Sequence, residues 1–327
     1  MMKRIIINAL LLLVACGILA FMGLTHGTPS LSLQQLWTLF SGEAARNVQL
    51  IVLEWRLPRV MMALLLGAAL GVSGAIFQSL LRNPLGSPDI LGFNTGAYSG
   101  VLVALVLFQQ NMAGLTLAAL AGGLLTAAVV WLFSWRNGVE TFRLIIVGIS
   151  VRALLMALNS WLIISASLEA ALSAGLWSAG SLNGITWAKT LPVTVVLLLA
   201  LLATGMLARR MRLLEMGDDT ACALGVPVER SRVMLMLTGV ILTAASTALA
   251  GPLSFIALLA PQIARRLCGG VKGALPLAAL CGALLLIAAD YAAQHLFLPY
   301  QLPVGVITVS LGGLYLIALL IREARRQ

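Results

Sequence analysis

Residues 54–100 read EWRLPRVMMALLLGAALGVSGAIFQSLLRNPLGSPDILGFNTGAYSG, and two apolar runs in this stretch flank a short polar break. The first run, 57–81, is long enough to cross the roughly 30 Å hydrocarbon core of a bilayer as one helix. The Asn83-Pro84 and Ser87-Pro88 pairs then interrupt the helix, and a second apolar run begins at about residue 89. The stretch therefore predicts two membrane-spanning helices joined by a short connection.

The rest of the chain repeats this pattern. Of its 327 residues 61% are hydrophobic and 10% charged, and the mean hydropathy is +1.02, which excludes a soluble globular domain. We expect an all-α polytopic membrane protein of about ten transmembrane helices, with residues 1–327 forming a single transmembrane domain. The expected spans are 5–24, 57–81, 89–107, 113–134, 143–165, 191–208, 233–250, 252–266, 274–293 and 304–321.

Spaced glycines predict how tightly these helices pack. Gly67 and Gly71 are four residues apart, and so are Gly92, Gly96 and Gly100. Small residues at this spacing line up on one helix face and let neighbouring helix backbones touch. We therefore expect close helix contacts on both sides of the polar break.

The net charge of +10 is distributed unevenly. With a cytoplasmic N-terminus and alternating spans, 16 of the 21 basic residues fall inside, which follows the positive-inside rule and requires no nucleic-acid partner. Both termini are then cytoplasmic. The inside residues are Lys3, Arg4, Arg82, Arg136, Arg143, Arg209, Arg210, Arg212, Arg230, Arg232, Arg265, Arg266, Lys272, Arg322, Arg325 and Arg326. Outside lie Arg46, Arg56, Arg59 and Lys189, and Arg152 falls within a span.

Cysteines and histidines give no sign of a disulfide framework or a metal site. None of the four cysteines falls in an expected outside loop, and His26 and His295 are far apart in the sequence. Residues 13–16, LVAC, are similar to a bacterial lipoprotein cleavage box. The apolar run continues past Cys16, however, so we expect the first span to be retained.

Two segments are expected outside the membrane, on the side opposite the two termini, at about 25–56 and 166–190. In the first, Leu33, Leu36, Trp37 and Phe40 follow helical spacing and predict an amphipathic helix on the membrane surface. The second is rich in small residues and contains two tryptophans. Two interpretations remain open for it: a short helix that re-enters the membrane or caps the pathway, and an interfacial belt of aromatic residues.

Arg152 lies well inside an expected span, where a charge is costly and suggests a function. Helical spacing places Met156 and Asn159 on the same face, so the three could line a translocation pathway. The alternative is that Arg152 pairs within the helix bundle, through Asp290 or free carbonyl groups.

Residues 209–232, RRMRLLEMGDDTACALGVPVERSR, form the most polar stretch of the chain. Gly217 is expected to end the preceding helix, and Asp218 or Asp219 to cap a new one. Gly225 suits the left-handed residue that ends a helix, and Pro227 prevents its continuation. The pattern predicts a short helix with defined ends within the polar segment at about 209–232.

Such a helix suits docking of a cytoplasmic protein better than a plain loop, which would not need these stops. Ala221 and Leu224 are three residues apart and are expected to share its apolar face. A catalytic site is disfavoured because no acid–base pair or third metal ligand is near.

Several blocks together resemble the FecCD family. They are RLPR at 56–59, GAALGVSGAIFQSLLRNPLGSPDILG at 67–92, MGDDTACALGV at 216–226, GPLSFIALLAPQIARR at 251–266 and LPVGVITVSLGG at 302–313. Members are membrane permeases of bacterial ABC importers for iron–siderophores, haem and cobalamin. The resemblance implies a type II ABC importer fold, as in cobalamin permeases, and a place in the bacterial inner membrane. It also implies a second permease subunit that is a different FecCD-family chain, two copies of a cytoplasmic ATPase and a periplasmic siderophore-binding protein.

The same resemblance assigns residues to two partners. Arg56 and Arg59 would meet acidic groups of the binding protein, and a further arginine of the cobalamin relative is replaced here by Gln294. The short helix would insert into the ATPase. The matching docking positions are Glu215, Gly217, Asp218, Ala221, Leu224 and Gly225.

The expected function is therefore import of a ferric siderophore, a catecholate of the enterobactin kind, by a subunit that is not itself an enzyme. The chain has no G-x-x-x-x-G-K-[ST] motif, so ATP and Mg²⁺ are expected on the partner ATPase, with no cofactor bound directly here. Alternatives are the same machinery for cobalamin, haem or a hydroxamate siderophore. An ion-coupled secondary transporter is a different class, and only Asp290 within a span and Asp89 at a span edge support it.

Overall fold

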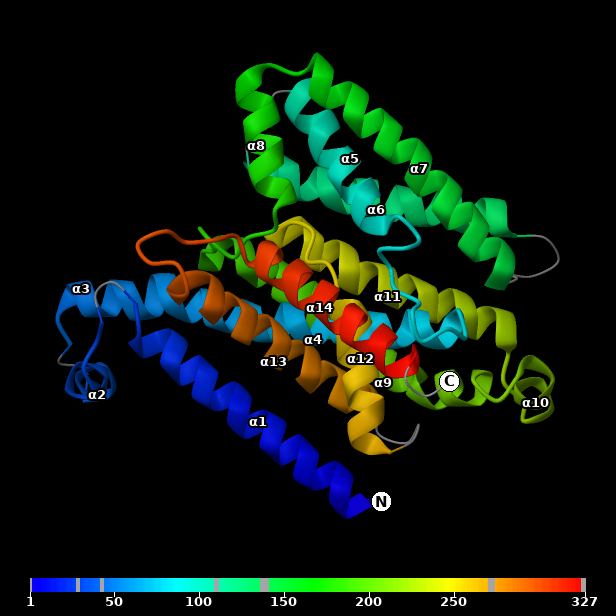
Figure 1. Cartoon of the computed structure of the whole chain (residues 1–327), viewed down its shortest axis with the longest axis horizontal. Helices are drawn as coiled ribbons and strands as arrows, with labels where there is room; N and C mark the ends of the chain where they lie inside the picture. The colour runs from blue at the N-terminus through cyan, green and yellow to red at the C-terminus, as the bar shows by residue number, and fades with distance from the viewer. Residues whose placement is uncertain are drawn as a thin grey trace.

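The computed structural model describes residues 2–27, 30–41, 44–108, 112–135, 141–269 and 274–324, and the fold is all-α (Figure 1). Arg136, Lys272, Arg325 and Arg326 lie outside the described residues. The helices are α1 (Met2–Thr25), α2 (Leu33–Ser41), α3 (Arg46–Gln49), η1 (Leu50–Arg56), α4 (Leu57–Leu80), α5 (Phe93–Val106), α6 (Met112–Ser134), α7 (Thr141–Ser165), α8 (Leu168–Ser178), α9 (Trp187–Leu214), α10 (Asp218–Ala223), α11 (Val228–Ala250), α12 (Ile256–Cys268), α13 (Ala274–His295) and α14 (Val304–Ala324).

Each of the ten expected spans coincides with a helix: α1, α4, α5, α6, α7, α9, α11, α12, α13 and α14. Among the described residues, seven helical segments are long and apolar enough to cross a membrane, judged by length and composition. Phe93–Val106 and Val304–Ala318 are shorter apolar segments, and α12 has 13 residues. The multi-pass architecture is therefore confirmed, with helices of unequal length.

The segment at about 25–56 was expected outside the membrane, but its last part belongs to a long helix. From Arg46 the chain is helical without interruption to Leu80, and η1 is π-helical. Pro58 does not end this helix. In the π-helical register its missing N–H would pair with the Leu53 carbonyl, and the indole N–H of Trp187 donates to that carbonyl instead, at 2.8 Å. A side chain thus satisfies the acceptor that proline leaves open, and the helix begins about eleven residues earlier than the sequence predicts.

Helix α4 lies at the centre of the molecule and packs on α9, α11, α12 and α13. A Cβ added to Gly67 or Gly71 would overlap backbone atoms of α13, and one added to Gly74 would overlap the carbonyl of Ala257 in α12. Gly96 and Gly100 approach α6 in the same way. The predicted close helix contacts are confirmed, because no side chain fits between these backbones.

Helices α5, α6, α7 and α8 form a second group, which Figure 1 shows beside the group around α4. Helices α5 and α6 pack together, α7 lies on both, and α11 contacts α4 as well as α5 and α6. Helix α11 therefore joins the two groups.

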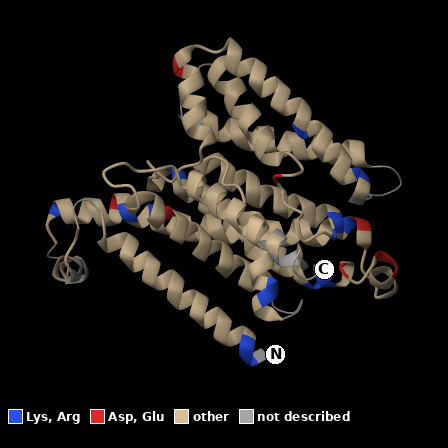
Figure 2. Ribbon diagram, in the orientation of Figure 1, with Lys and Arg blue, Asp and Glu red and all other residues tan. Residues whose placement is uncertain are grey.

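The two ends of the helix bundle differ in charge. Figure 1 places the start of α1, the end of α14 and helix α10 towards one end, and α2 and α3 at the other. Figure 2 shows that most of the drawn Lys and Arg residues gather towards the end that carries α10. We call these the α10 end and the α2–α3 end.

Candidate functional site

Helix α10 at the α10 end begins at a glycine. Gly217 has φ +111°, a backbone conformation that side chains other than glycine rarely adopt, and it is the N-cap residue. The expectation that Asp218 or Asp219 caps the helix is wrong, since both lie in its first turn and no side chain caps it. Their carboxylates still suit the positive end of the helix dipole.

The end of α10 follows the sequence prediction. Gly225 is left-handed at φ +78°, and its N–H donates to the Cys222 carbonyl at 2.9 Å. The N–H of Val226 donates to the Ala221 carbonyl at 3.0 Å. These two bonds form a Schellman motif, which satisfies carbonyl groups that the last helical turn leaves open. Pro227 then precedes the start of α11, so the short helix has defined ends.

Two arginines anchor α10 through Asp218. Arg82, from the connection after α4, lies 2.7 Å from Asp218 Oδ1, and Arg232 of α11 lies 2.7 Å from Oδ2. Arg232 also contacts Glu229 at 3.5 Å. Charge-assisted bonds to both oxygens hold the helix against two neighbouring elements. These contacts fix the direction in which α10 projects.

The faces of α10 differ from the prediction in one respect. Ala221 is fully buried, whereas Leu224 is 59% exposed, so the two do not share a buried face. The helix ends at Ala223, and Leu224 follows it as the C-cap residue and turns outward. Leu224 is thereby available to a partner, while Ala221 holds the helix on the bundle. Glu215, at the C-cap of α9, is half-buried.

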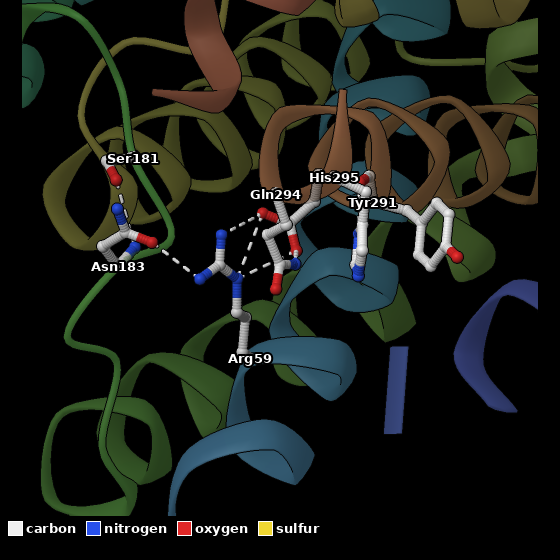
Figure 3. A network of polar contacts seen from close by, with 7 residues as sticks. Arg59, Ser181, Asn183, Tyr291, Gln294 and His295 are labelled. Carbon is white, nitrogen blue, oxygen red and sulfur yellow. Dashed lines mark hydrogen bonds and ion pairs between the residues drawn. The ribbon is translucent and has the colours of Figure 1, made fainter. Parts of the chain in front are cut away.

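At the α2–α3 end, Arg59 forms an internal ion pair with Asp290 of α13 (Figure 3). The guanidinium donates to Asp290 Oδ1 at 2.8 Å and to Oδ2 at 3.0 Å, and Nη1 donates to Asn183 Oδ1 at 2.6 Å. Gln294 donates to Asp290 Oδ2 at 2.8 Å. The predicted alternative that Asp290 pairs with Arg152 is wrong, because Arg59 of the neighbouring α4 reaches it instead.

Arg56 also bonds within the subunit. Its Nη1 donates to the carbonyl groups of Leu24 and Thr25 at 2.8 and 3.2 Å. These carbonyls belong to the last turn of α1, where a cation stabilises the open acceptors and the negative end of the helix dipole. Arg56 therefore ties α1 to the long helix that contains α4.

The two histidines, distant in sequence, come together beside this network. His26 Nδ1 lies 2.7 Å from the Tyr291 hydroxyl, and the Tyr291 and His295 rings stack at 4.2 Å. A cavity of about 160 Å³ borders Gln294 and His295. Among the described residues, no group of three or more His, Cys, Asp or Glu side chains could hold a metal ion.

Arg152 lies on the exposed side of α7, next to the connection that precedes α5. A Cβ on Gly92 would come within 2.9 Å of the Arg152 Cβ, and Asp89 in the same connection interacts with Arg152 electrostatically. Asn94 donates to Asp89, and Thr247 of α11 donates to Asn94 Oδ1 at 2.7 Å. The acid that interacts with Arg152 is thus one that the sequence had marked only as a span edge.

The three residues of the predicted pathway face do not share one environment. Met156 is 53% exposed, whereas Asn159 is 5% exposed and its Oδ1 has no hydrogen-bond partner in the described part of the chain. One turn further on, Leu162 packs with Leu102 of α5 and Ala174 of α8. Neighbouring helices therefore cover this end of the face, although the helical spacing is as predicted.

The second outside segment contains a helix. In α8, the side chain of Ser167 caps the start and accepts from the Ala170 N–H at 3.3 Å. At its other end Trp177 stacks on Tyr98 of α5, with 5.9 Å between the ring centroids. The segment therefore contains a short helix, which packs on α5 and α7.

Residues 11–322 match the FecCD transport family. This chain belongs to the FecCD family. It is 63% identical to the ferric enterobactin transport system permease protein FepG of Escherichia coli, over 99% of this chain and 98% of that protein. It is 39% identical to the achromobactin transport system permease protein CbrC of Dickeya dadantii, over 89% of this chain and 83% of that protein.

The family fold is also found among solved structures. A chain from an inward-facing ABC transporter assigned to the metal-chelate type superposes with a TM-score of 0.87 at 29% identity. The superposition covers 96% of this chain and 98% of that chain. The resemblance to FecCD permeases is confirmed, as is the importer-permease fold.

The sequence did not predict that Asn183 and Gln294 bond to the Arg59–Asp290 pair, or that Tyr291 bonds to His26. A buried acid such as Asp290 within an apolar span signals that some cation must meet it. Nothing in the local sequence indicates that this cation is Arg59, 231 positions away.

Proposed function

We propose that this FecCD-family chain is a permease subunit of an ATP-binding-cassette importer that moves a ferric siderophore of the enterobactin type from periplasm to cytoplasm. The observation that carries the proposal is the near full-length similarity to a protein named as the ferric enterobactin permease. Energy comes from ATP and Mg²⁺ on a separate ATPase, since this chain has no phosphate-binding loop motif.

The proposed orientation places the α10 end in the cytoplasm and the α2–α3 end in the periplasm of the bacterial inner membrane. The gathering of Lys and Arg towards the α10 end supports it. Both termini are then cytoplasmic, and α2, α3 and α8 belong to the periplasmic segments. The whole chain acts as one transmembrane domain beside a second FecCD-family permease.

The proposed ATPase-docking element is α10 with its flanks. Asp218 is fixed by two arginines, so a force applied to α10 passes directly into the connection after α4 and into α11. Exposed Leu224 supplies an apolar contact. A rigid element that links a partner to two helices of the bundle suits the transmission of an ATP-driven movement.

The proposed binding-protein contact at the opposite end includes Arg56 and Arg59. Both already bond within the subunit, so docking would use the part of each guanidinium that these bonds leave accessible. Charge complementarity of this kind chiefly raises the rate of association.

The proposed translocation pathway passes the exposed side of α7 at Arg152 and Met156. An anionic ferric catecholate needs positive charge along its route through a low-dielectric region. Arg152 offers a guanidinium there, and it interacts electrostatically with Asp89. Asn159 is buried, so it would contact the cargo only if the helices packed on its face of α7 moved apart.

The test is uptake of ⁵⁵Fe-labelled enterobactin by bacterial cells that lack their own ferric enterobactin permease and carry this chain. Uptake that depends on this chain is the expected result. Uptake of cobalamin, haem or a ferric hydroxamate in place of ferric enterobactin would show that this other compound is the substrate. Uptake that persists without any ATPase partner would indicate an ion-coupled transporter.

Docking is tested in the same cells with Leu224→Asp, which places a charge on the expected apolar contact. Uptake and co-purification of the ATPase should fall, while the amount of folded permease stays constant because Leu224 is exposed. Cys222→Ser is the matched control, since Cys222 is exposed on α10, two residues before Leu224, and is no expected docking position. Equal loss in both variants, or in neither, would contradict the docking role.

A further inference from the structure

A cavity of about 290 Å³ lies near the α10 end between α4, α9, α12 and α13. Its polar lining consists of Arg212 and Glu215 of α9 and its C-cap, and Arg265 of α12. The rest of the lining is apolar and includes Ala75, Ala208, Met211, Pro261 and Leu275. No sequence motif marks this cavity, because its walls come from four separate helices.

One wall of the cavity carries an unsatisfied cationic donor. Nη2 of Arg265 is buried and has no hydrogen-bond partner in the described part of the chain. Glu215 interacts with Arg265 electrostatically, but no hydrogen bond joins Nη2 to it. A buried guanidinium N–H without an acceptor is costly. Nη2 itself is closed to the cavity, so a ligand in the cavity would meet Arg265 through other atoms of its side chain.

The charge of the site favours a monoanion. Arg212 and Arg265 carry two positive charges and Glu215 one negative charge, which leaves one positive charge at the cavity. Guanidinium groups bind phosphate oxygens with short, directed hydrogen bonds. A phosphodiester, with one negative charge and several acceptor oxygens, matches the net charge of the site and the donor chemistry of its two arginines.

The apolar walls add a second requirement. On α9 the cavity extends from Gly205 to Glu215. Gly205 lies four residues, or about 6 Å along the helix, before Arg209, the first of three arginines near the end of α9. A Cβ on Gly205 would meet no atom within 4 Å, so the groove is open at this point. Water would find few polar partners along such walls. A hydrocarbon chain would bury apolar surface against them.

We propose that this cavity binds one anionic phospholipid of the cytoplasmic leaflet, with its phosphodiester at Arg265 and Arg212 and an acyl chain in the groove beside Gly205. Only the choice of leaflet rests on the orientation given under the proposed function. Basic pockets between membrane helices at the cytoplasmic surface are suited to such headgroups. The bound lipid would contact Arg265 and hold α9 against α12 and α13.

The test uses the purified full chain in an uncharged detergent and native mass spectrometry. Phosphatidylglycerol and phosphatidylcholine with identical acyl chains are titrated separately. The wild type should retain phosphatidylglycerol in preference to phosphatidylcholine. Equal binding of the two lipids would overturn the proposal, because the phosphodiester charge would then be irrelevant.

Two variants separate the headgroup from the acyl chain. Arg265→Gln should weaken phosphatidylglycerol binding by about tenfold or more, as expected for loss of a charge-assisted contact. Arg266→Gln is the matched control, because Arg266 is exposed and lies over the Tyr315 ring instead. Gly205→Leu fills the groove while keeping both arginines, and it should also weaken binding.

Unchanged phosphatidylglycerol binding in Arg265→Gln overturns the proposal. If that variant does not fold, unchanged binding in Gly205→Leu does so. Inorganic phosphate is the remaining arm: displacement of the lipid by phosphate at millimolar concentration would make this a site for free anions and not for a lipid. Because no arm measures transport, failure here is distinct from failure of the proposed function.

Discussion

Replacing Asp290 by asparagine removes the charge from the most buried ion pair described in this chain. The Asp290 side chain is 3% exposed and that of Arg59 16% exposed. The substituted amide would keep one acceptor oxygen, but Arg59 would lose its counter-ion and Gln294 could lose its acceptor. Removing one partner of a buried ion pair costs about 3–5 kcal/mol. Because Arg59 keeps its bond to Asn183 and some exposure, we expect a loss near the lower limit, about 3 kcal/mol.

The loss is measured as the change in free energy of unfolding of the purified protein in mixed micelles. Asp219→Asn is the matched control, because Asp219 is an exposed acid on α10 and its loss should cost at most about 0.5 kcal/mol. The double variant Arg59→Met, Asp290→Leu removes both charges and should be more stable than Asp290→Asn, since no unpaired charge remains.

Two results would refute this reasoning. One is an Asp290→Asn protein as stable as the Asp219→Asn control. The other is a double variant whose loss equals the sum of the losses of Arg59→Met and Asp290→Leu measured singly, which would show that the pair is not coupled. The pair also affects any docking test, because Arg59→Glu would place two carboxylates together. The double variant removes Arg59 without leaving an unpaired charge, so it tests the contribution of Arg59 to the binding-protein contact better than Arg59→Glu does.

Three further substitutions test other parts of the structure. Gly225→Ala should lower the free energy of unfolding by about 1 kcal/mol, because alanine disfavours the observed φ of +78°. Amide hydrogen exchange at the end of α10 should become faster, and unchanged exchange would contradict the Schellman motif. Gly74→Ala should lower the free energy of unfolding by about 1–3 kcal/mol, since its Cβ overlaps a carbonyl of α12, whereas Gly313→Ala, which meets no neighbour, should have little effect. Equal stability of these two variants would contradict the close contact. Arg152→Met should lower enterobactin uptake but not the amount of folded protein, because Arg152 is on the exposed side of α7; loss of folded protein would instead indicate a structural role.

The sequence alone determined where the helices are and how some of them end. A backbone in hydrocarbon must satisfy its hydrogen bonds internally, so each long apolar run has to be a helix, and all ten expected spans are helical. The stops around α10 were also local: Gly217 and Gly225 adopt positive φ, and Pro227 prevents the helix from continuing. Closely spaced glycines marked the faces on which backbones touch.

The tertiary structure decided which polar groups meet. The partner of Asp290 is Arg59 and not Arg152, and His26 meets Tyr291 across 265 positions. A lipid-facing side and a core-facing side are equally apolar in a membrane protein, so hydrophobic periodicity does not reveal which helices are neighbours. The continuation of the long helix through Pro58 likewise depended on Trp187, a donor from another segment. These features arise only when distant helices pack, because only then do their few polar side chains acquire partners.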